Sequence, residues 1–90
     1  VVITNPTHYA IAIKYDDGKM DAPIIVAKGV DFVAQKIKLI ANEHEIVMVE
    51  NRPLARSLYD EVEIGDRVPE EFFKTIAEIL AYVYRIQRKI

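Results

Sequence analysis

Residues 24–49 read IIVAKGVDFVAQKIKLIANEHEIVMV, and this stretch predicts a strand, a helix and a second strand. Ile24–Lys28 is a short apolar run, residues 31–43 carry apolar side chains at helical spacing, and Ile46–Val49 is apolar again. A strand that returns through a helix to the same sheet lies parallel to the first, with a right-handed crossover. We therefore expect a βαβ unit.

Particular residues set the limits and the apolar face of the expected helix. Gly29 should end the first strand, because glycine punctuates regular structure. Asp31 is expected to cap the helix at its N-terminus. The apolar positions at helical spacing are Val33, Ile37, Ile40 and Ala41. The helix should therefore be amphipathic, with these side chains on its inner face.

Two further strands are expected before this unit. Val1–Thr4 is a β-branched run, which favours a strand. Tyr9–Tyr15 alternates in part and reads as a second strand. The residues between them, 5–8, are expected to form a turn.

Two helices are expected after the βαβ unit. Asn51 with Pro53 should start a short helix that runs to about Tyr59. Pro69 should open the last helix, since the two glutamates after it suit the helix dipole. The stripe that should face the sheet is Phe72, Phe73, Ile76, Leu80, Val83 and Ile86. The predicted fold class is α/β, with a small mixed sheet of about four strands flanked by helices.

Composition indicates one small folded domain over residues 1–90. Of these residues 51% are hydrophobic and 29% are charged, which excludes a disordered tail. Cysteine is absent, so a disulfide scaffold and a thiolate metal site are excluded. The net charge of −2 gives no basis for nucleic-acid binding. Because the sequence opens at Val1 without methionine or a signal peptide, we expect a fragment of a longer protein.

The Asn5-Pro6 bond predicts unusual chemistry. Asparagine ordinarily deamidates when the next backbone nitrogen attacks its side chain, but proline has no N–H. The remaining route is the reverse, in which the Asn5 side-chain nitrogen attacks the Asn5 carbonyl carbon. The products are a C-terminal succinimide on Asn5 and a new N-terminus at Pro6. We therefore predict a backbone that cuts itself without a protease.

The two residues after this bond complete a β-turn pattern. With Asn5 at position i and Pro6 at i+1, the turn hydrogen bond runs from the His8 N–H to the Asn5 carbonyl oxygen. That oxygen becomes the oxyanion during attack. The His8 imidazole is expected to move the proton, and Thr7 to orient that step or stabilise the turn. We therefore take these four residues as catalytic in a single-turnover self-cleavage, with no turnover of external substrates.

Several motifs along the chain are shared with one known family. They are VITNPTHYA (residues 2–10), GKMDAP (18–23), AKG (27–29), ENRPLAR (50–56), IGDRVPEEF (64–72) and AYVY (81–84). Through them the chain resembles the cytoplasmic domain of the export switch proteins of flagella and injectisomes, the FlhB/YscU/SpaS family. The resemblance covers nearly the whole chain and is greatest to the flagellar branch.

The resemblance implies a substrate-specificity switch in a type III protein export apparatus, tuned by cleavage between Asn5 and Pro6. It implies a membrane-embedded part and a linker ahead of this domain, at the cytoplasmic face of the bacterial inner membrane. The implied partners are other membrane components of the export gate, export substrates of the rod and hook type, and their ruler protein. No cofactor and no nucleic acid are implied.

The resemblance also implies an apolar patch that recognises early export signals. Its positions in this sequence are Ala22, Pro23, Ala77 and Leu80. The plainer interpretation makes Ala77 and Leu80 core residues and Pro23 the start of a strand. The sequence leaves both open, because it does not show which side chains are exposed.

Two other functions stay open as well. In one, the domain is an interaction module whose turn is never cut. In the other, His8 works with a carboxylate in a conventional hydrolase, although no nucleophile elbow accompanies it. His44, between Glu43 and Glu45, suggests a metal ligand, but a solvated loop is the better interpretation. We therefore expect no metal site.

Overall fold

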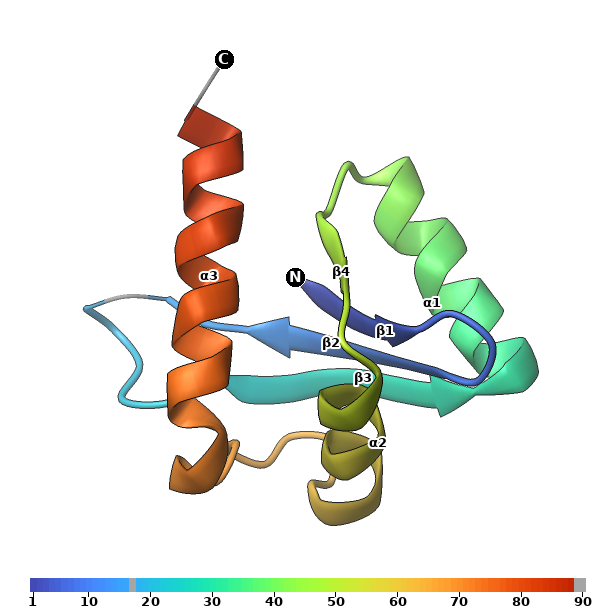
Figure 1. Ribbon diagram of the computed structural model, residues 1–90, viewed down its shortest axis with the longest axis horizontal. Helices are drawn as coiled ribbons and strands as arrows, with labels where there is room; N and C mark the ends of the chain where they lie inside the picture. The colour runs from blue at the N-terminus through green and yellow to red at the C-terminus, as the bar shows by residue number, and fades with distance from the viewer. Residues whose placement is uncertain (17, 89–90) are drawn as a thin grey trace.

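The fold is an α/β sandwich, as predicted (Figure 1). The computed structural model describes residues 1–16 and 18–88, apart from the side chain of residue 88. Its elements are β1 (Val2–Asn5), β2 (Tyr9–Lys14), β3 (Ile24–Val30), α1 (Asp31–Glu43), β4 (Met48–Glu50), α2 (Arg52–Glu61), the short 3-10 helix η1 (Glu70–Phe72) and α3 (Phe73–Arg88).

The strands of the described chain form one four-stranded sheet in the order β3-β2-β1-β4. β2 pairs antiparallel with both β1 and β3, while β1 pairs parallel with β4. The two strands that α1 connects therefore run in the same direction, as predicted. They are not neighbours, however, because the hairpin of β1 and β2 lies between them.

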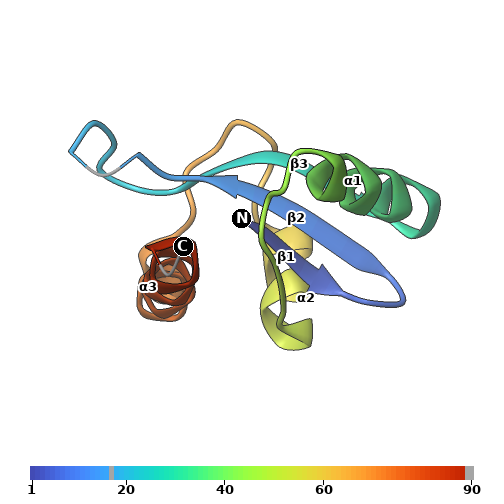
Figure 2. The same cartoon turned by 90° about the horizontal axis from the view of Figure 1, so that it is seen from above.

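The two faces of the sheet are covered by different helices (Figure 2). On the α2 and α3 side, Ile3 and Ile11 pack with Leu58 and Ile76 in a core of large branched side chains. On the α1 side, the core is built mainly from alanines with a single valine: Val2, Ala10, Ala34 and Ala41. Neighbouring strand residues alternate between these cores, since side chains of a strand point to opposite faces.

The inner face of α1 differs from the prediction. Ala34 and Ala41 are buried, whereas Val33 and Ile40 are 53% and 45% exposed. Ile37 packs partly buried against the core as predicted. The sheet offers α1 small side chains, so the helix lies close and turns its own small residues inward. Ala41 was among the predicted positions and is buried, whereas the prediction did not include Ala34.

The start of α1 also differs, for a local steric reason. β3 continues through Gly29 to Val30, and Val30 occupies the N-cap position without a side-chain hydrogen bond. Gly29 is needed because a Cβ there would overlap the Val33 side chain. Asp31 is the first helical residue rather than the cap, and its φ of 45° lies in the left-handed region.

β4 begins two residues later than predicted. The backbone N–H of Ile46 donates to the carbonyl oxygen of Ala41 at 2.8 Å, and that of Glu45 donates to Asn42. These bonds close the C-terminus of α1. Residues 45 and 46 therefore belong to the helix end and do not extend the strand.

The last two helices largely follow the prediction. The Asn51 side chain accepts a hydrogen bond from the Leu54 backbone N–H at 3.1 Å and caps α2. Pro69 precedes η1, which leads into α3. Of the predicted stripe, Ile76 and Val83 are buried and Ile86 is 40% exposed. The other members, Phe72, Phe73 and Leu80, are partly buried, while Ile79 is buried although it was not predicted.

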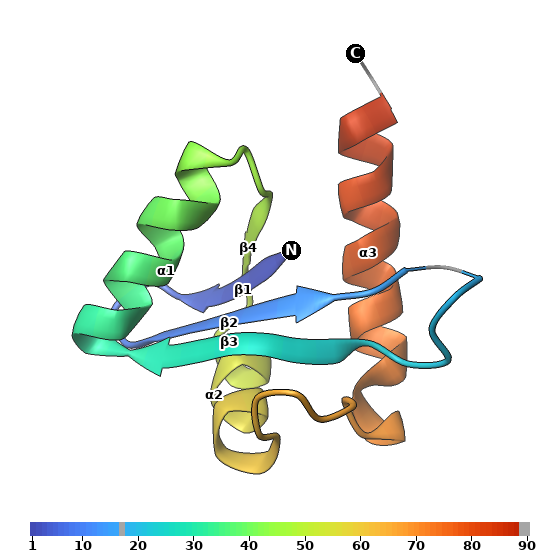
Figure 3. The ribbon, with the colours of Figure 1, turned by 180° about the vertical axis from the view of Figure 1, so that it is seen from behind.

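The segment between α2 and α3 covers the start of the β3 edge (Figure 3). The Ile25 backbone bonds to Gly65 and Asp66, and the Val68 N–H donates to the Pro23 carbonyl oxygen at 2.8 Å. These bonds fix α3 beside the end of β2. Within residues 1–16 and 18–88, every helix is too short or too polar to traverse a lipid bilayer.

Candidate functional site

The turn of residues 5–8 joins β1 to β2 and lies beside the first turn of α1 (Figure 1). Asn5 pairs with Tyr9 at the end of the ladder, so both ends of the turn are held by the sheet. The His8 backbone N–H donates to the Asn5 carbonyl oxygen at 3.1 Å, which is the predicted turn hydrogen bond. A donor is therefore already in place on the oxygen of the Asn5-Pro6 bond.

The Asn5 side chain is held within the same turn. Its Oδ1 accepts from the Thr7 backbone N–H at 3.3 Å and from the Thr7 hydroxyl at 3.2 Å. This is an Asx-turn, in which a side-chain amide mimics backbone. Both oxygens of Asn5 are thus hydrogen-bonded, and Thr7 contacts the side chain directly.

His8 pairs with a carboxylate from another element. Its Nδ1 lies 3.5 Å from Oδ1 of Asp31, and both side chains are largely exposed. The Asp31 backbone N–H also donates to the His8 carbonyl oxygen at 2.9 Å. An acidic partner at Nδ1 leaves Nε2 as the ring nitrogen available for proton transfer.

Lys38 is a second contact from α1 to the turn. Its Nζ donates to the Pro6 carbonyl oxygen at 3.0 Å, in a partly buried position. Neither Lys38 nor the pairing of Asp31 was predicted from the sequence. Both residues are distant from the turn along the chain, and only the order of the strands brings α1 beside it.

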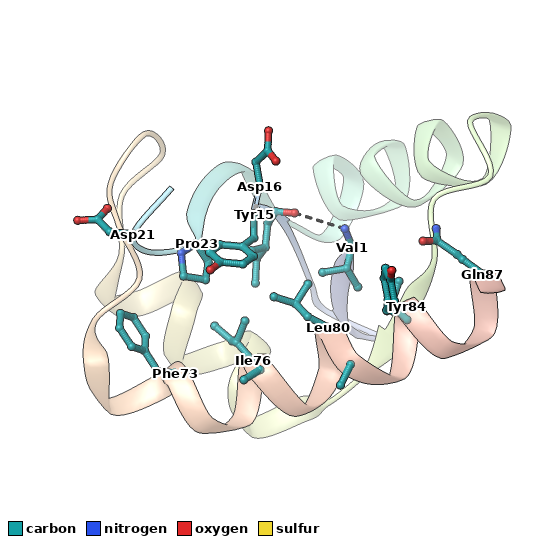
Figure 4. Close-up of a pocket in the computed structure, with 14 residues that line it drawn as sticks. Val1, Tyr15, Asp16, Asp21, Pro23, Phe73, Ile76, Leu80, Tyr84 and Gln87 are labelled. Atoms are coloured by element: carbon teal, nitrogen blue, oxygen red, sulfur yellow. Dashed lines mark hydrogen bonds between the residues drawn. The ribbon is translucent and has the colours of Figure 1, made fainter. Parts of the chain in front are cut away.

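The predicted apolar patch lies partly in a separate groove (Figure 4). A cavity of about 830 Å³ between the end of β2 and α3 is lined by Pro23, Ala77 and Leu80, together with Tyr15. Ala77 is exposed, whereas Leu80 is partly buried and packs against the core while also lining the groove. Ala22 is only 4% exposed and is not among the lining residues, whereas Pro23 is also buried but does line the groove.

His44 lies exposed at the end of α1. Among residues 1–16 and 18–88, no three histidines or carboxylates gather as a metal-binding group would require.

Comparison with known proteins identifies relatives over the whole chain. A family model described as the FlhB HrpN YscU SpaS family matches residues 1–83. The chain is 71% identical over 90 residues to flagellar biosynthetic protein FlhB of Bacillus subtilis (strain 168) and 50% identical to FlhB of Aquifex aeolicus (strain VF5). These matches cover 100% of this chain but 25% and 26% of the relatives, so it spans about a quarter of their length.

Solved structures agree with the sequence comparison. The cytoplasmic domain of FlhB from Shewanella putrefaciens matches with a TM-score of 0.91 at 41% identity, covering 97% of this chain and 67% of that one. A mutated EscU C-terminal domain matches with a TM-score of 0.87 at 33% identity, covering 90% and 81%. By family model, sequence identity and fold, the chain belongs to the FlhB, HrpN, YscU and SpaS family.

Proposed function

We propose that this domain is the substrate-specificity switch of a type III protein export apparatus of the flagellar type, and that it cuts itself between Asn5 and Pro6. The observation that carries the proposal is that both the backbone carbonyl and the side chain of Asn5 are hydrogen-bonded within the turn. The turn holds its carbonyl oxygen through His8 and its side-chain amide through Thr7. Nucleophile and target therefore belong to one residue whose freedom is already reduced.

The reaction is an intramolecular transfer of the Asn5 acyl group. Nδ2 of Asn5 adds to its own carbonyl carbon, and the oxygen that receives the His8 N–H becomes an oxyanion. The intermediate then expels the Pro6 nitrogen, which takes up the proton that Nδ2 gives away. No water is consumed until the succinimide opens. His8 moves the proton, with Asp31 at its other ring nitrogen.

The sheet explains why the fold survives such a cut. β1 lies between β2 and β4, and its side chains Val2, Ile3 and Thr4 are 2%, 0% and 7% exposed. Hydrogen bonds on both edges and burial on both faces hold the strand after the backbone breaks. Cleavage therefore changes the surface near the turn alone, where a rigid loop becomes two chain ends.

The known relatives support the setting, since the matched structure from Shewanella putrefaciens is a cytoplasmic domain of FlhB. The EscU structures include variants in which an asparagine, or the proline directly after it, is replaced. We assign this domain to the cytoplasmic face of the bacterial inner membrane, next to a membrane-embedded part of the same protein. Its partners there are other export-gate components, rod- and hook-type substrates and their ruler protein.

The groove beside α3 is the proposed docking site for early export signals. It joins Pro23, Ala77 and Leu80 on one concave, mainly apolar surface, on the side of the sheet away from α1. Apolar side chains of an extended signal would fill it. Because the groove and the turn lie at different ends of β2, a cut at the turn changes the surface there and leaves the lining of the groove in place.

Denaturing electrophoresis of native and Asn5→Ala chains tests the proposal. The native chain should yield a fragment that begins at Pro6, and the Asn5→Ala chain should stay whole. If the native chain stays whole for days at neutral pH, self-cleavage is excluded, and the alternative, an interaction module whose turn is never cut, is favoured. Turnover of an added ester or amide would instead favour the hydrolase.

A further inference from the structure

We propose that Lys38 is a positioning residue of the self-cleavage reaction, acting on the Asn5 side chain through the peptide group between Pro6 and Thr7. The inference rests on the proposed function, since it names a further residue of the same site. It adds a second residue of α1, besides Asp31, to the groups that act on the turn.

Three hydrogen-bonding groups follow one another at the turn. The Lys38 ammonium donates to the Pro6 carbonyl oxygen at 3.0 Å. That carbonyl shares one peptide group with the Thr7 N–H, which donates to Oδ1 of Asn5 at 3.3 Å. A single peptide group thus separates a positive charge from the side chain that attacks.

The peptide group transmits the effect of this charge by polarisation. A hydrogen bond to a carbonyl oxygen draws electron density from the amide nitrogen, so the N–H of that peptide becomes a better donor. The effect is larger when the donor is charged, as the Lys38 ammonium is. Lys38 therefore strengthens the hydrogen bond that Oδ1 of Asn5 receives.

A stronger donor at Oδ1 favours the nucleophilic form of the side chain. An amide nitrogen is a poor nucleophile until it gives up a proton, and the resulting negative charge then resides largely on the amide oxygen. The Thr7 N–H and hydroxyl stabilise this charge directly. Lys38 stabilises it through the peptide and keeps its own protons throughout. The proton from Nδ2 still ends on the Pro6 nitrogen.

Lys36 provides a matched control on the same helix. It lies exposed two residues before Lys38, whereas Lys38 is partly buried against the turn. Loss of either lysine changes the net charge equally. A difference in cleavage rate between the Lys38 and Lys36 variants therefore comes from the contact of Lys38 with Pro6 and not from the change in net charge.

The test measures cleavage rates of the native chain and of Lys38→Met, Lys38→Gln, Lys38→Arg and Lys36→Met. Each chain is synthesised in a cell-free system in the cold and warmed at neutral pH, and its uncut fraction is followed by mass spectrometry. Thermal unfolding of each variant checks the fold. Lys38→Met and Lys38→Gln should cut about tenfold more slowly, less than the loss from removing a direct oxyanion donor. Lys38→Arg and Lys36→Met should stay within about threefold of native.

Each outcome decides the proposal. Native rates in a folded Lys38→Met chain overturn it while leaving the self-cleavage intact. The proposal is also overturned if Lys38→Gln cuts as fast as Lys38→Arg, because a neutral hydrogen-bond donor at position 38 is then sufficient and the charge is not needed. If Lys38→Met unfolds, the comparison of Lys38→Arg with Lys38→Gln decides the same question. A native chain that never cuts removes both this inference and the proposed function.

Discussion

The backbone N–H of Asp31 donates to the carbonyl oxygen of His8 at 2.9 Å, so the first residue of α1 is hydrogen-bonded to the last residue of the turn formed by residues 5–8. The carboxylate of Asp31 also lies 3.5 Å from the His8 ring. Asp31 adopts a φ of 45°, which is uncommon for a residue other than glycine. Strained backbone of this kind is often found at functional sites.

Replacement of His8 by alanine should slow cleavage roughly tenfold or more, because a positioned proton-transfer group is lost. The backbone donor on the Asn5 oxygen is kept, so a residual rate should remain. Asp31→Asn should have a smaller effect, since the His8–Asp31 pair is exposed and the ring itself is retained. The measurement is the uncut fraction against time. An unchanged rate in the His8→Ala chain would remove His8 from the chemistry.

Replacement of Pro6 by alanine should change the products as well as the rate. Alanine restores a backbone N–H at the position where proline has none. That nitrogen can attack the Asn5 side chain, so deamidation without chain cleavage should compete and cutting should slow. Mass spectrometry separates the two, because deamidation leaves the chain whole. A Pro6→Ala chain that cuts as fast as native, with no deamidation, would contradict the proposed route.

Gly29→Ala should destabilise the fold by about 2 kcal/mol, because a methyl group there overlaps Val33. Without this contact the same substitution would stabilise by limiting the unfolded chain, by roughly 0.4–1 kcal/mol. Val33 is 53% exposed, so Val33→Ala alone should cost little. Val33→Ala removes the overlapping Cγ1 but keeps the Cβ, which lies 2.7 Å from the added methyl group, so the double variant should recover only part of the lost stability, measured by denaturant unfolding. If Gly29→Ala and the double variant lose the same stability, the overlap with the Val33 side chain is not the cause of the loss.

A charge in the groove should weaken docking of early export signals. Ala77→Asp puts a carboxylate on an apolar surface without disturbing the core, since Ala77 is exposed. Calorimetric titration with the N-terminal segment of a rod- or hook-type substrate should show affinity reduced at least about tenfold. Thr75→Asp is the control, because Thr75 is exposed on the same helix outside this groove. Equal affinities for both variants would exclude the groove as the docking site.

The turn was predictable from the sequence, because its hydrogen bonds are local. Asn5 and Pro6 are adjacent, and the hydrogen bond from His8 follows from the standard geometry of a four-residue turn. The cap at Asn51 was predictable for the same reason, since its partner Leu54 lies three residues away. Motifs that close their hydrogen bonds within a few residues depend little on the rest of the fold.

The contacts of α1 were not predictable, because they depend on the order of the strands. The pattern of residues 24–49 predicted parallel strands but not the hairpin that lies between them. That hairpin brings Asp31 and Lys38 to the turn. It also presents alanines to α1, so Ala34 is buried where Val33 was expected. Ala34, Ile37 and Ala41 do recur at helical spacing, but the larger apolar residues Val33 and Ile40 beside them obscure that pattern in the sequence.

The mass of the released Val1–Asn5 piece tests the central claim most directly. A chain synthesised in the cold, warmed at neutral pH and then denatured to free the cut strand from the sheet should yield this piece first as a cyclic imide, lighter by one water than the peptide with a free carboxylate. The heavier form should follow as the imide opens. An Asn5→Ala chain treated identically should release nothing. The account is contradicted if the native chain stays whole, or if the first piece released already carries the added water.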